Sequence, residues 1–120
     1  MKHQALVVGS SGIIGSAVSQ LLAKEGWSVA GLARRPTAEP GVKPISADLL
    51  DPERLTAALQ DIAPTHVFLT TWARQSSEAE NIRVNAQLVR NLLEAVRASG
   101  SVRHVALSTG LKHYLGPFEA

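Results

Sequence analysis

Five short apolar runs, each too brief for a helix, alternate along this chain with segments whose apolar residues recur at helical spacing. The runs lack the polar alternation of a sheet that has one face in water, so both faces should be covered. Strands buried on both faces and separated by helices predict an α/β fold with a parallel sheet. The expected strands span residues 4–10, 27–33, 42–48, 66–71 and 104–109.

Three helices are expected between these strands. The first should span Ile13–Lys24 and end at Gly26. Asp51 can cap a second helix, with Pro52 in its first turn, and the third should span Glu80–Ala98. The apolar residues at helical spacing are Ile14, Val18, Leu21 and Leu22, then Leu55 and Leu59, and finally Ile82, Leu88, Val89, Leu92, Leu93 and Val96. Right-handed crossovers then favour a doubly wound (Rossmann) sheet of about five strands, formed by residues 1–120 as one domain.

The stretch GSSGIIG joins the first strand to the first helix, with glycines at 9, 12 and 15. Gly9 permits a tight exit from the strand, Gly12 lets the backbone approach a pyrophosphate, and Gly15 lets the helix pack close to the sheet. N–H groups at the helix start then face the phosphates. A tight turn without a ligand is the alternative interpretation. The residues expected to bind a dinucleotide here are Gly9, Ser10, Ser11, Gly12, Ile13, Ile14 and Gly15.

The end of the second expected strand bears on the choice of cofactor. NAD-binding domains usually carry an acidic residue there, which accepts a hydrogen bond from the ribose 2′-hydroxyl. This chain has Arg34 and Arg35 instead. Guanidinium groups bind phosphate with two parallel hydrogen bonds, which favours NADP(H). Two solvated loop arginines are the alternative.

Two further strand ends should face the same crevice, because ligands bind beyond the carboxyl ends of the strands in such sheets. Asp48 and Leu49 follow the third expected strand, where the carboxylate can accept a hydrogen bond from the adenine amino group. A role for Asp48 in the turn is the alternative. Thr70, Thr71 and Trp72 end the fourth strand, where the ribose or pyrophosphate should pass, although the indole can equally pack against a helix.

Composition excludes several other classes of protein. The net charge is +2 and the basic residues are scattered, so no nucleic-acid partner is expected. There is no cysteine, and the four histidines show no metal-ligand spacing, so no metal site is expected. No apolar run reaches membrane-spanning length and the start is too short for a signal peptide, so we expect a cytoplasmic protein with no membrane partner.

Several stretches together resemble one family: VVGSSGIIGSAVSQLL, GLARRP, ADLLD, TTWA, NAQLVRNLLEAV and STGLKHYLGPFEA. They are similar to the extended, atypical short-chain dehydrogenase/reductases. More narrowly, they resemble the progesterone 5β-reductase/iridoid synthase-like enone reductases. The resemblance spans the whole chain, and its most specific part is the closing stretch from Ser108 to Ala120.

The resemblance implies NADPH-dependent hydride transfer to the C=C bond of an enone, or to a carbonyl, in a small-molecule substrate. It maps onto Lys112 the lysine that tunes a catalytic tyrosine and holds the nicotinamide ribose, and it places Ser108 and Thr109 at the cofactor. Tyr114 matches the structural tyrosine of the motif, whereas the catalytic tyrosine of the family follows downstream. We therefore expect the chain to be a fragment or truncated product of a longer protein, and its own catalysis stays open.

Two other functions remain possible at this point. The chain can be a non-catalytic dinucleotide-binding sensor module, which no sequence feature excludes. It can also be related to sugar-nucleotide epimerases or dehydratases, although the stretch TGLKHYLGPF argues against this. A truncated domain would expose apolar surface on the fifth strand, so a homodimer through that surface is a further expectation.

Overall fold

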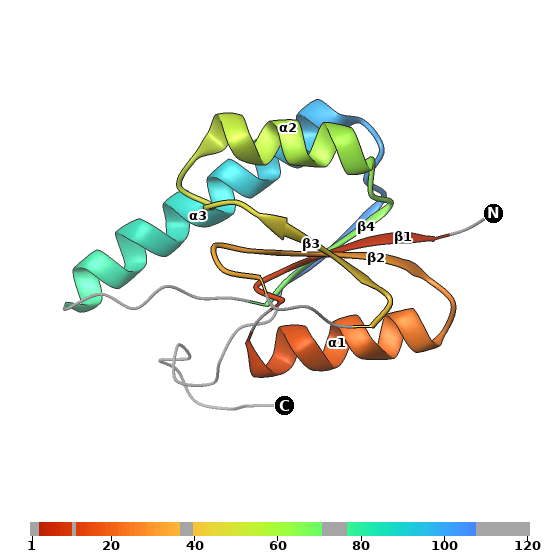
Figure 1. Ribbon diagram of the computed structural model, residues 1–120. Helices are drawn as coiled ribbons and strands as arrows, with labels where there is room; N and C mark the ends of the chain where they lie inside the picture. The colour runs from red at the N-terminus through yellow and green to blue at the C-terminus, as the bar shows by residue number, and fades with distance from the viewer. Residues whose placement is uncertain (1–2, 11, 37–39, 71–76, 108–120) are drawn as a thin grey trace, which may run out of the picture.

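The computed structural model describes residues 3–10, 12–36, 40–70 and 77–107. All strand pairs in these ranges are parallel, in the order β3-β2-β1-β4-β5. Figure 1 shows α1 on one side of the sheet and α2 and α3 on the other, which confirms the doubly wound Rossmann fold. The elements are β1 (Gln4–Val8), α1 (Ile13–Lys24), β2 (Ser28–Ala33), β3 (Val42–Ser46), α2 (Pro52–Ile62), β4 (His66–Leu69), α3 (Glu78–Ser99) and β5 (His104–Leu107).

Helix boundaries follow the capping residues. The side chain of Asp51 accepts a hydrogen bond from Arg54 N at 3.2 Å and so starts α2 as expected. The predicted start of α3 was two residues late, because Ser77 caps this helix by accepting a hydrogen bond from Glu80 N at 3.2 Å. Gly100 ends α3 with a left-handed φ of 69°, which suits glycine.

Two apolar clusters cover the two faces of the sheet. Leu6 and Val8 of β1 belong to the larger cluster, which packs against α2 and α3, while Val7 points to the smaller cluster under α1. This alternation along one strand, with all four apolar residues buried, is the expected signature of a sheet covered on both faces.

Four of the apolar helix residues singled out from the sequence are exposed rather than buried. On α3, Leu88, Leu92 and Ala95 form the buried stripe, so Leu93 lies about 100° away from Leu92 around the helix. The same rotation separates exposed Leu21 from partly buried Leu22 on α1. The exposed residues are Ile14, Leu21, Ile82 and Leu93.

The two edges of the sheet differ. β3 forms one edge and carries Pro44, which has no N–H to offer to another strand and so discourages edge pairing. β5 forms the other edge, and Val105 there is exposed. The expected homodimer through β5 stays a prediction. None of the described helices is long and apolar enough to cross a membrane.

Candidate functional site

The turn after β1 is held tightly between β1 and β2. Gly9 has a φ of 90°, a conformation that L side chains rarely adopt. Its N–H donates to the carbonyl oxygen of Leu32 at 2.7 Å, and Gly12 N donates to the carbonyl oxygen of Gly9 at 3.1 Å. The backbone path from the sheet into α1 therefore depends on glycine at position 9.

Gly15 is required by the packing of α1 against the strand ends. A Cβ added there would lie 2.7 Å from both the carbonyl carbon of Gly9 and the Oγ1 atom of Thr70. Thr70 in turn joins β4 to β1, because its N–H and hydroxyl both donate to the carbonyl oxygen of Val8, at 2.9 and 2.8 Å. The structure thus gives Gly15 and Thr70 a role in closing helix and strands together, and their contact with a cofactor stays a prediction.

Gly12 differs from Gly9 and Gly15, since no atom in the described part of the chain requires glycine at this position. Its φ is −81°, and a Cβ would make only an ordinary contact of 3.5 Å with the carbonyl oxygen of Gly9. The N-cap residue of α1 is Gly12, which has no side chain to offer, whereas the side chains of Asp51 and Ser77 cap α2 and α3. Open space beside an uncapped helix start fits a pyrophosphate, which would fill the space and accept from the first N–H groups of α1.

Apolar side chains at the start of α1 add to this fit. Ile13 and Ile14 are 92% and 52% exposed, although both are large and apolar. They immediately follow Gly12, so a ligand seated on the turn would cover them. Their predicted contact with a dinucleotide is consistent with this exposure and stays a prediction.

Ser10 and Gly31 form a close contact that the sequence interpretation missed. Ser10 is buried, and a Cβ on Gly31 would lie 2.7 Å from both Cβ and Oγ of Ser10. Gly31 therefore lets the turn after β1 lie directly against β2. A glycine inside an expected strand is the signal that could have indicated such an approach.

Arg34 and Arg35 lie immediately after β2, with both side chains exposed. The carbonyl oxygen of Arg34 accepts a hydrogen bond from Ser46 Oγ at 3.0 Å, so the backbone here is tied to the end of β3. Among the described residues the one ion pair joins Arg83 to Glu80, and neither Arg34 nor Arg35 takes part. Both guanidinium groups are thus unpaired with acidic groups in the described part of the chain.

The structure favours the turn role for Asp48. Its Oδ1 accepts from Leu50 N at 2.9 Å and its carbonyl oxygen accepts from Asp51 N at 3.0 Å, which forms the bend that leads into α2. The side chain of Leu49 is buried in the larger cluster, and its carbonyl oxygen accepts from Asn91 Nδ2 at 2.8 Å. Contacts of Asp48 and Leu49 with adenine stay predictions.

The parallel sheet brings several of the predicted site residues to the end of the sheet where the strands terminate. Gly9, Arg34 and Thr70 follow β1, β2 and β4, whose carboxyl ends lie side by side. The remaining predicted residues are outside the described ranges, and their roles stay predictions: Ser11, Thr71, Trp72, Ser108, Thr109 and Lys112.

A family model described as "NAD dependent epimerase/dehydratase family" matches residues 5–117. The chain belongs to this family. It is 38% identical to 3-oxo-Delta(4,5)-steroid 5-beta-reductase from Arabidopsis thaliana, over 95% of this chain and 32% of that protein. It is 36% identical to (S)-8-oxocitronellyl enol synthase from Catharanthus roseus, over 98% of this chain and 32% of that protein. The resemblance to 5β-reductase- and iridoid synthase-like enzymes is confirmed.

Solved structures of the family share the fold. UDP-glucose 4-epimerase from Brucella ovis, in complex with NAD, matches with a TM-score of 0.82 and 25% identity, over 98% of this chain and 38% of that one. The chain spans about a third of the length of the curated relatives that it matches.

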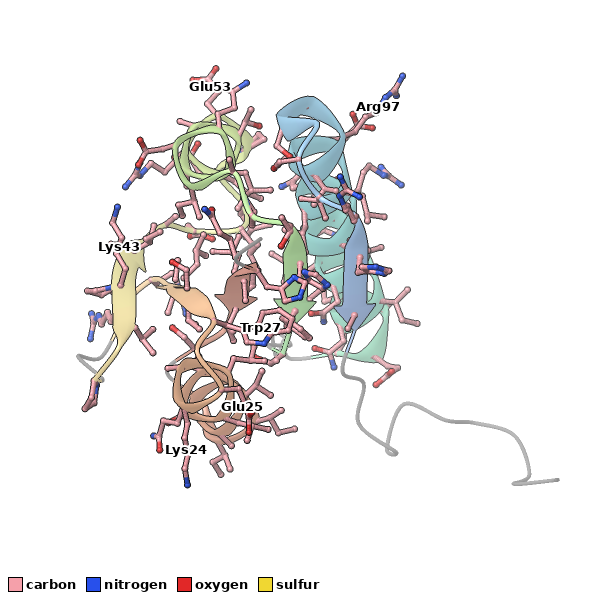
Figure 2. The ribbon with its side chains drawn as sticks, turned by 90° about the vertical axis from the view of Figure 1, so that its right-hand side faces the viewer. Lys24, Glu25, Trp27, Lys43, Glu53 and Arg97 are labelled. Atoms are coloured by element: carbon pink, nitrogen blue, oxygen red, sulfur yellow. The ribbon has the colours of Figure 1, made fainter. Side chains whose placement is uncertain are left out.

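The opposite end of the sheet, where the strands begin, carries an aromatic cluster that the sequence interpretation did not anticipate. The ring of His66 has its centroid 4.9 Å from that of His104, 4.8 Å from Trp27 and 5.2 Å from His3. Figure 2 shows Trp27 between α1 and the sheet. Burial, together with the neighbouring imidazoles of His104 and His3, lowers the pKa of His66. No group of three potential metal ligands occurs among the described residues.

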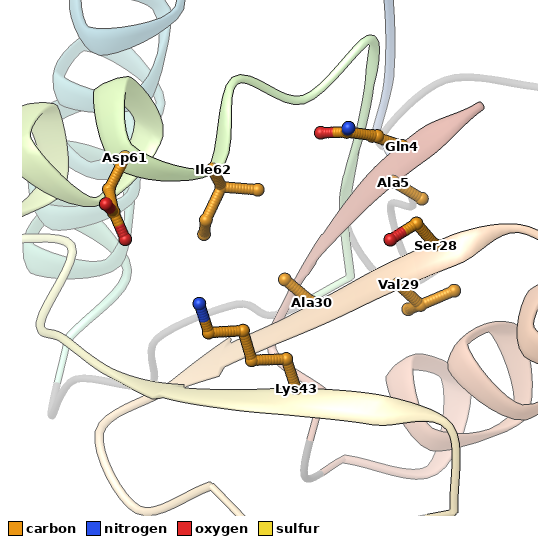
Figure 3. A pocket seen from close by; sticks show the side chains of 8 residues that line it. All are labelled: Gln4, Ala5, Ser28, Val29, Ala30, Lys43, Asp61 and Ile62. Carbon is orange, nitrogen blue, oxygen red and sulfur yellow. The ribbon is translucent and has the colours of Figure 1, made fainter. Parts of the chain in front are cut away.

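A cavity of about 180 Å³ also lies at the end of the sheet where the strands begin, between the sheet and the end of α2. Gln4 and Ser28 begin β1 and β2, and Lys43 and Asp61 reach toward the cavity from β3 and α2 (Figure 3). It is remote from the glycine turn, because the two lie at opposite ends of the same strands.

Proposed function

We propose that residues 1–120 form the NADP(H)-binding portion of an oxidoreductase that transfers hydride to the C=C bond of an enone, or to a carbonyl. The observation that carries the proposal is the open space at Gly12, beside the uncapped start of α1 and between close-packed Gly9 and Gly15. Glycine is a suitable cap residue, but no described atom excludes a side chain at this position, so close approach by a ligand supplies a further reason for glycine there. Membership of the NAD dependent epimerase/dehydratase family supports the same site.

The choice of NADP(H) over NAD(H) rests on the residues after β2. Arg34 and Arg35 are exposed and, among the described residues, form no ion pair. Their position at the end of β2 is where the adenosine ribose of a dinucleotide lies in such sheets. Two guanidinium groups favour the 2′-phosphate of NADP(H), and no acidic residue directly follows β2 to accept from a 2′-hydroxyl.

The reaction is proposed from the relatives, one named as a steroid 5-beta-reductase and one as an enol synthase. Bound NADPH would supply the hydride. Lys112 is proposed to place its ammonium group beside a tyrosine hydroxyl and the nicotinamide ribose. A positive charge there favours the phenolate form of the tyrosine and stabilises negative charge that develops on the substrate oxygen.

One observation favours a second candidate. The epimerase from Brucella ovis, with NAD bound, shares the fold of this chain over nearly its whole length. A sugar-nucleotide epimerase that keeps NAD bound would prefer NAD to NADP(H). Cofactor preference therefore separates the two candidates, and a domain that binds NADP(H) but supports no turnover in the longer protein would be the sensor module.

The cofactor is tested by calorimetric titration of the chain with NADPH and with NADH. Replacing Arg34 and Arg35 together by Ala should weaken NADPH binding by about 1–3 kcal/mol more than NADH binding, because charge-assisted hydrogen bonds are lost. The matched control replaces Arg90 and Arg97, two exposed arginines of α3, which gives the same change of charge. Equal weakening of the two cofactors, or equal effects in the control, would contradict the assignment.

The reaction is tested on the 120-residue chain and on any longer gene product that contains it. NADPH oxidation with an enone substrate should be clear in that longer protein and negligible in the 120-residue chain. Lys112→Met should lower turnover much more than it weakens NADPH binding. Full turnover in the Lys112→Met variant would remove the lysine from the proposed mechanism.

A further inference from the structure

The carbonyl and hydroxyl groups of Ser46 connect three elements near the arginine pair. Ser46 ends β3 and lies in register with Ala33, the last residue of β2. Its Oγ donates to the carbonyl oxygen of Arg34 at 3.0 Å, and its own carbonyl oxygen accepts from Arg54 Nη2 at 3.2 Å. A chain of hydrogen bonds thus runs from the first turn of α2 to the loop that carries Arg34.

Arg54 is held at both its backbone and its side chain. Its N–H donates to the carboxylate of Asp51, the cap of α2, and its guanidinium group reaches back to the end of β3. The side chain lines a cavity of about 420 Å³ between β3 and α2, and Arg54 as a whole is exposed. A guanidinium group has five N–H donors, and that of Arg54 donates one hydrogen bond within the described residues, to the carbonyl oxygen of Ser46.

The charges around this point are uneven. Arg34 and Arg35 follow the end of β2, the guanidinium group of Arg54 reaches the end of β3, and none of the three forms an ion pair within the described ranges. The carboxylate of Asp51 accepts from the backbone N–H of Arg54 and forms no ion pair with its guanidinium group. Two of the elements that border the proposed ribose site therefore carry arginines without ion pairs in the described part of the chain.

We propose that Arg54 is a specificity-determining residue for the 2′-phosphate of NADP(H): through Ser46 it positions the backbone of Arg34, and its charge adds to that of the arginine pair. The inference rests on the proposed function, because it assigns a further residue to the same cofactor site. Sequence alone did not indicate it, since Arg54 is twenty residues from Arg34 and belongs to a different element.

The test compares adenosine 2′,5′-bisphosphate with AMP, two ligands that differ by the 2′-phosphate alone, in calorimetric titrations of the chain. Arg54→Met should lower the ratio of their affinities by about two- to fivefold, as expected for one exposed charge contact. Arg54→Lys, which keeps the charge without the planar donor group, should lower it less. Ser46→Ala, which removes the bond to Arg34 and keeps all charges, should also lower the ratio.

The control is Arg97→Met, because Arg97 lies in the last turn of α3, on the side of the sheet that ends in β5 and away from β3 (Figure 2). This variant should leave the ratio unchanged. If Arg54→Met lowers the affinities of both ligands equally, or neither, the inference is overturned and Arg54 has only a structural role. If the unchanged chain does not distinguish the two ligands, the proposed NADP(H) function itself is overturned.

Discussion

Gly12 and Gly15 stand three residues apart in one turn, yet the structure predicts different consequences of adding a methyl group to each. At Gly15 the new Cβ would lie 2.7 Å from both the carbonyl carbon of Gly9 and the Oγ1 atom of Thr70. The carbonyl group of Gly9 is backbone and cannot rotate away as a side chain can. Such overpacking typically costs about 1–3 kcal/mol of folding free energy. The higher helix propensity of alanine returns only about 0.5–1 kcal/mol, so Gly15→Ala should be clearly destabilising.

At Gly12 the same change should be nearly neutral for the fold. The nearest atom to the new Cβ is 3.5 Å away and φ is −81°. The loss of a favourable cap residue and the reduced entropy of the unfolded chain are small effects of opposite sign, each of about 0.5–1 kcal/mol. The free energy of unfolding of Gly12→Ala should therefore lie within about 0.5 kcal/mol of that of the unchanged chain.

Urea unfolding followed by circular dichroism measures both variants under identical conditions. We expect the urea midpoint of Gly15→Ala to fall well below that of Gly12→Ala. The dependence of the free energy of unfolding on urea should be similar in both, because the surface exposed on unfolding is the same. Equal midpoints would show that α1 can move away from β1 at little cost. That result would refute the packing account of the turn.

Two further predictions concern parts of the domain away from the turn. Burial and the neighbouring His104 and His3 lower the pKa of His66 in the folded state, so the unfolded state binds the proton more readily. The free energy of unfolding should therefore fall as the pH drops below about 6.5. His66→Gln should reduce the dependence of the urea midpoint on pH. An identical slope in the variant would contradict the assignment to His66. Asn91→Leu leaves the carbonyl oxygen of Leu49 without its donor and should cost about 1–3 kcal/mol in the same assay, and an unchanged midpoint would contradict it.

Much of the fold could be predicted from the sequence because its signals are local. The run ALVV is apolar at every position, which only a strand covered on both faces accommodates. Ile13–Lys24 was predicted with both ends correct, since a glycine turn precedes it and Gly26 follows. The start of α3 was missed because Ser77, which caps it, lies in a polar stretch where several residues could have served.

The site was only partly predictable, because its contacts join residues that are distant in the sequence. The glycine spacing indicates a turn, but nothing local shows that Gly15 touches Thr70 or that Gly31 touches Ser10. The cluster of His3, His66 and His104 follows from the parallel pairing of β1, β4 and β5, each of which begins at or just after a histidine. That shared position was visible in the sequence, whereas the order of the strands was not.

The most direct test of the central claim is a calorimetric titration of the chain with NADPH, compared with Gly12→Val. A Cβ at position 12 would make only an ordinary contact of 3.5 Å with the carbonyl oxygen of Gly9, and the branched side chain of valine should then occupy the space beside the start of α1. We expect the unchanged chain to bind NADPH, and the Gly12→Val variant to fold with a similar urea midpoint but no longer to bind NADPH. NADPH binding of unchanged affinity in a folded Gly12→Val variant would contradict the central claim.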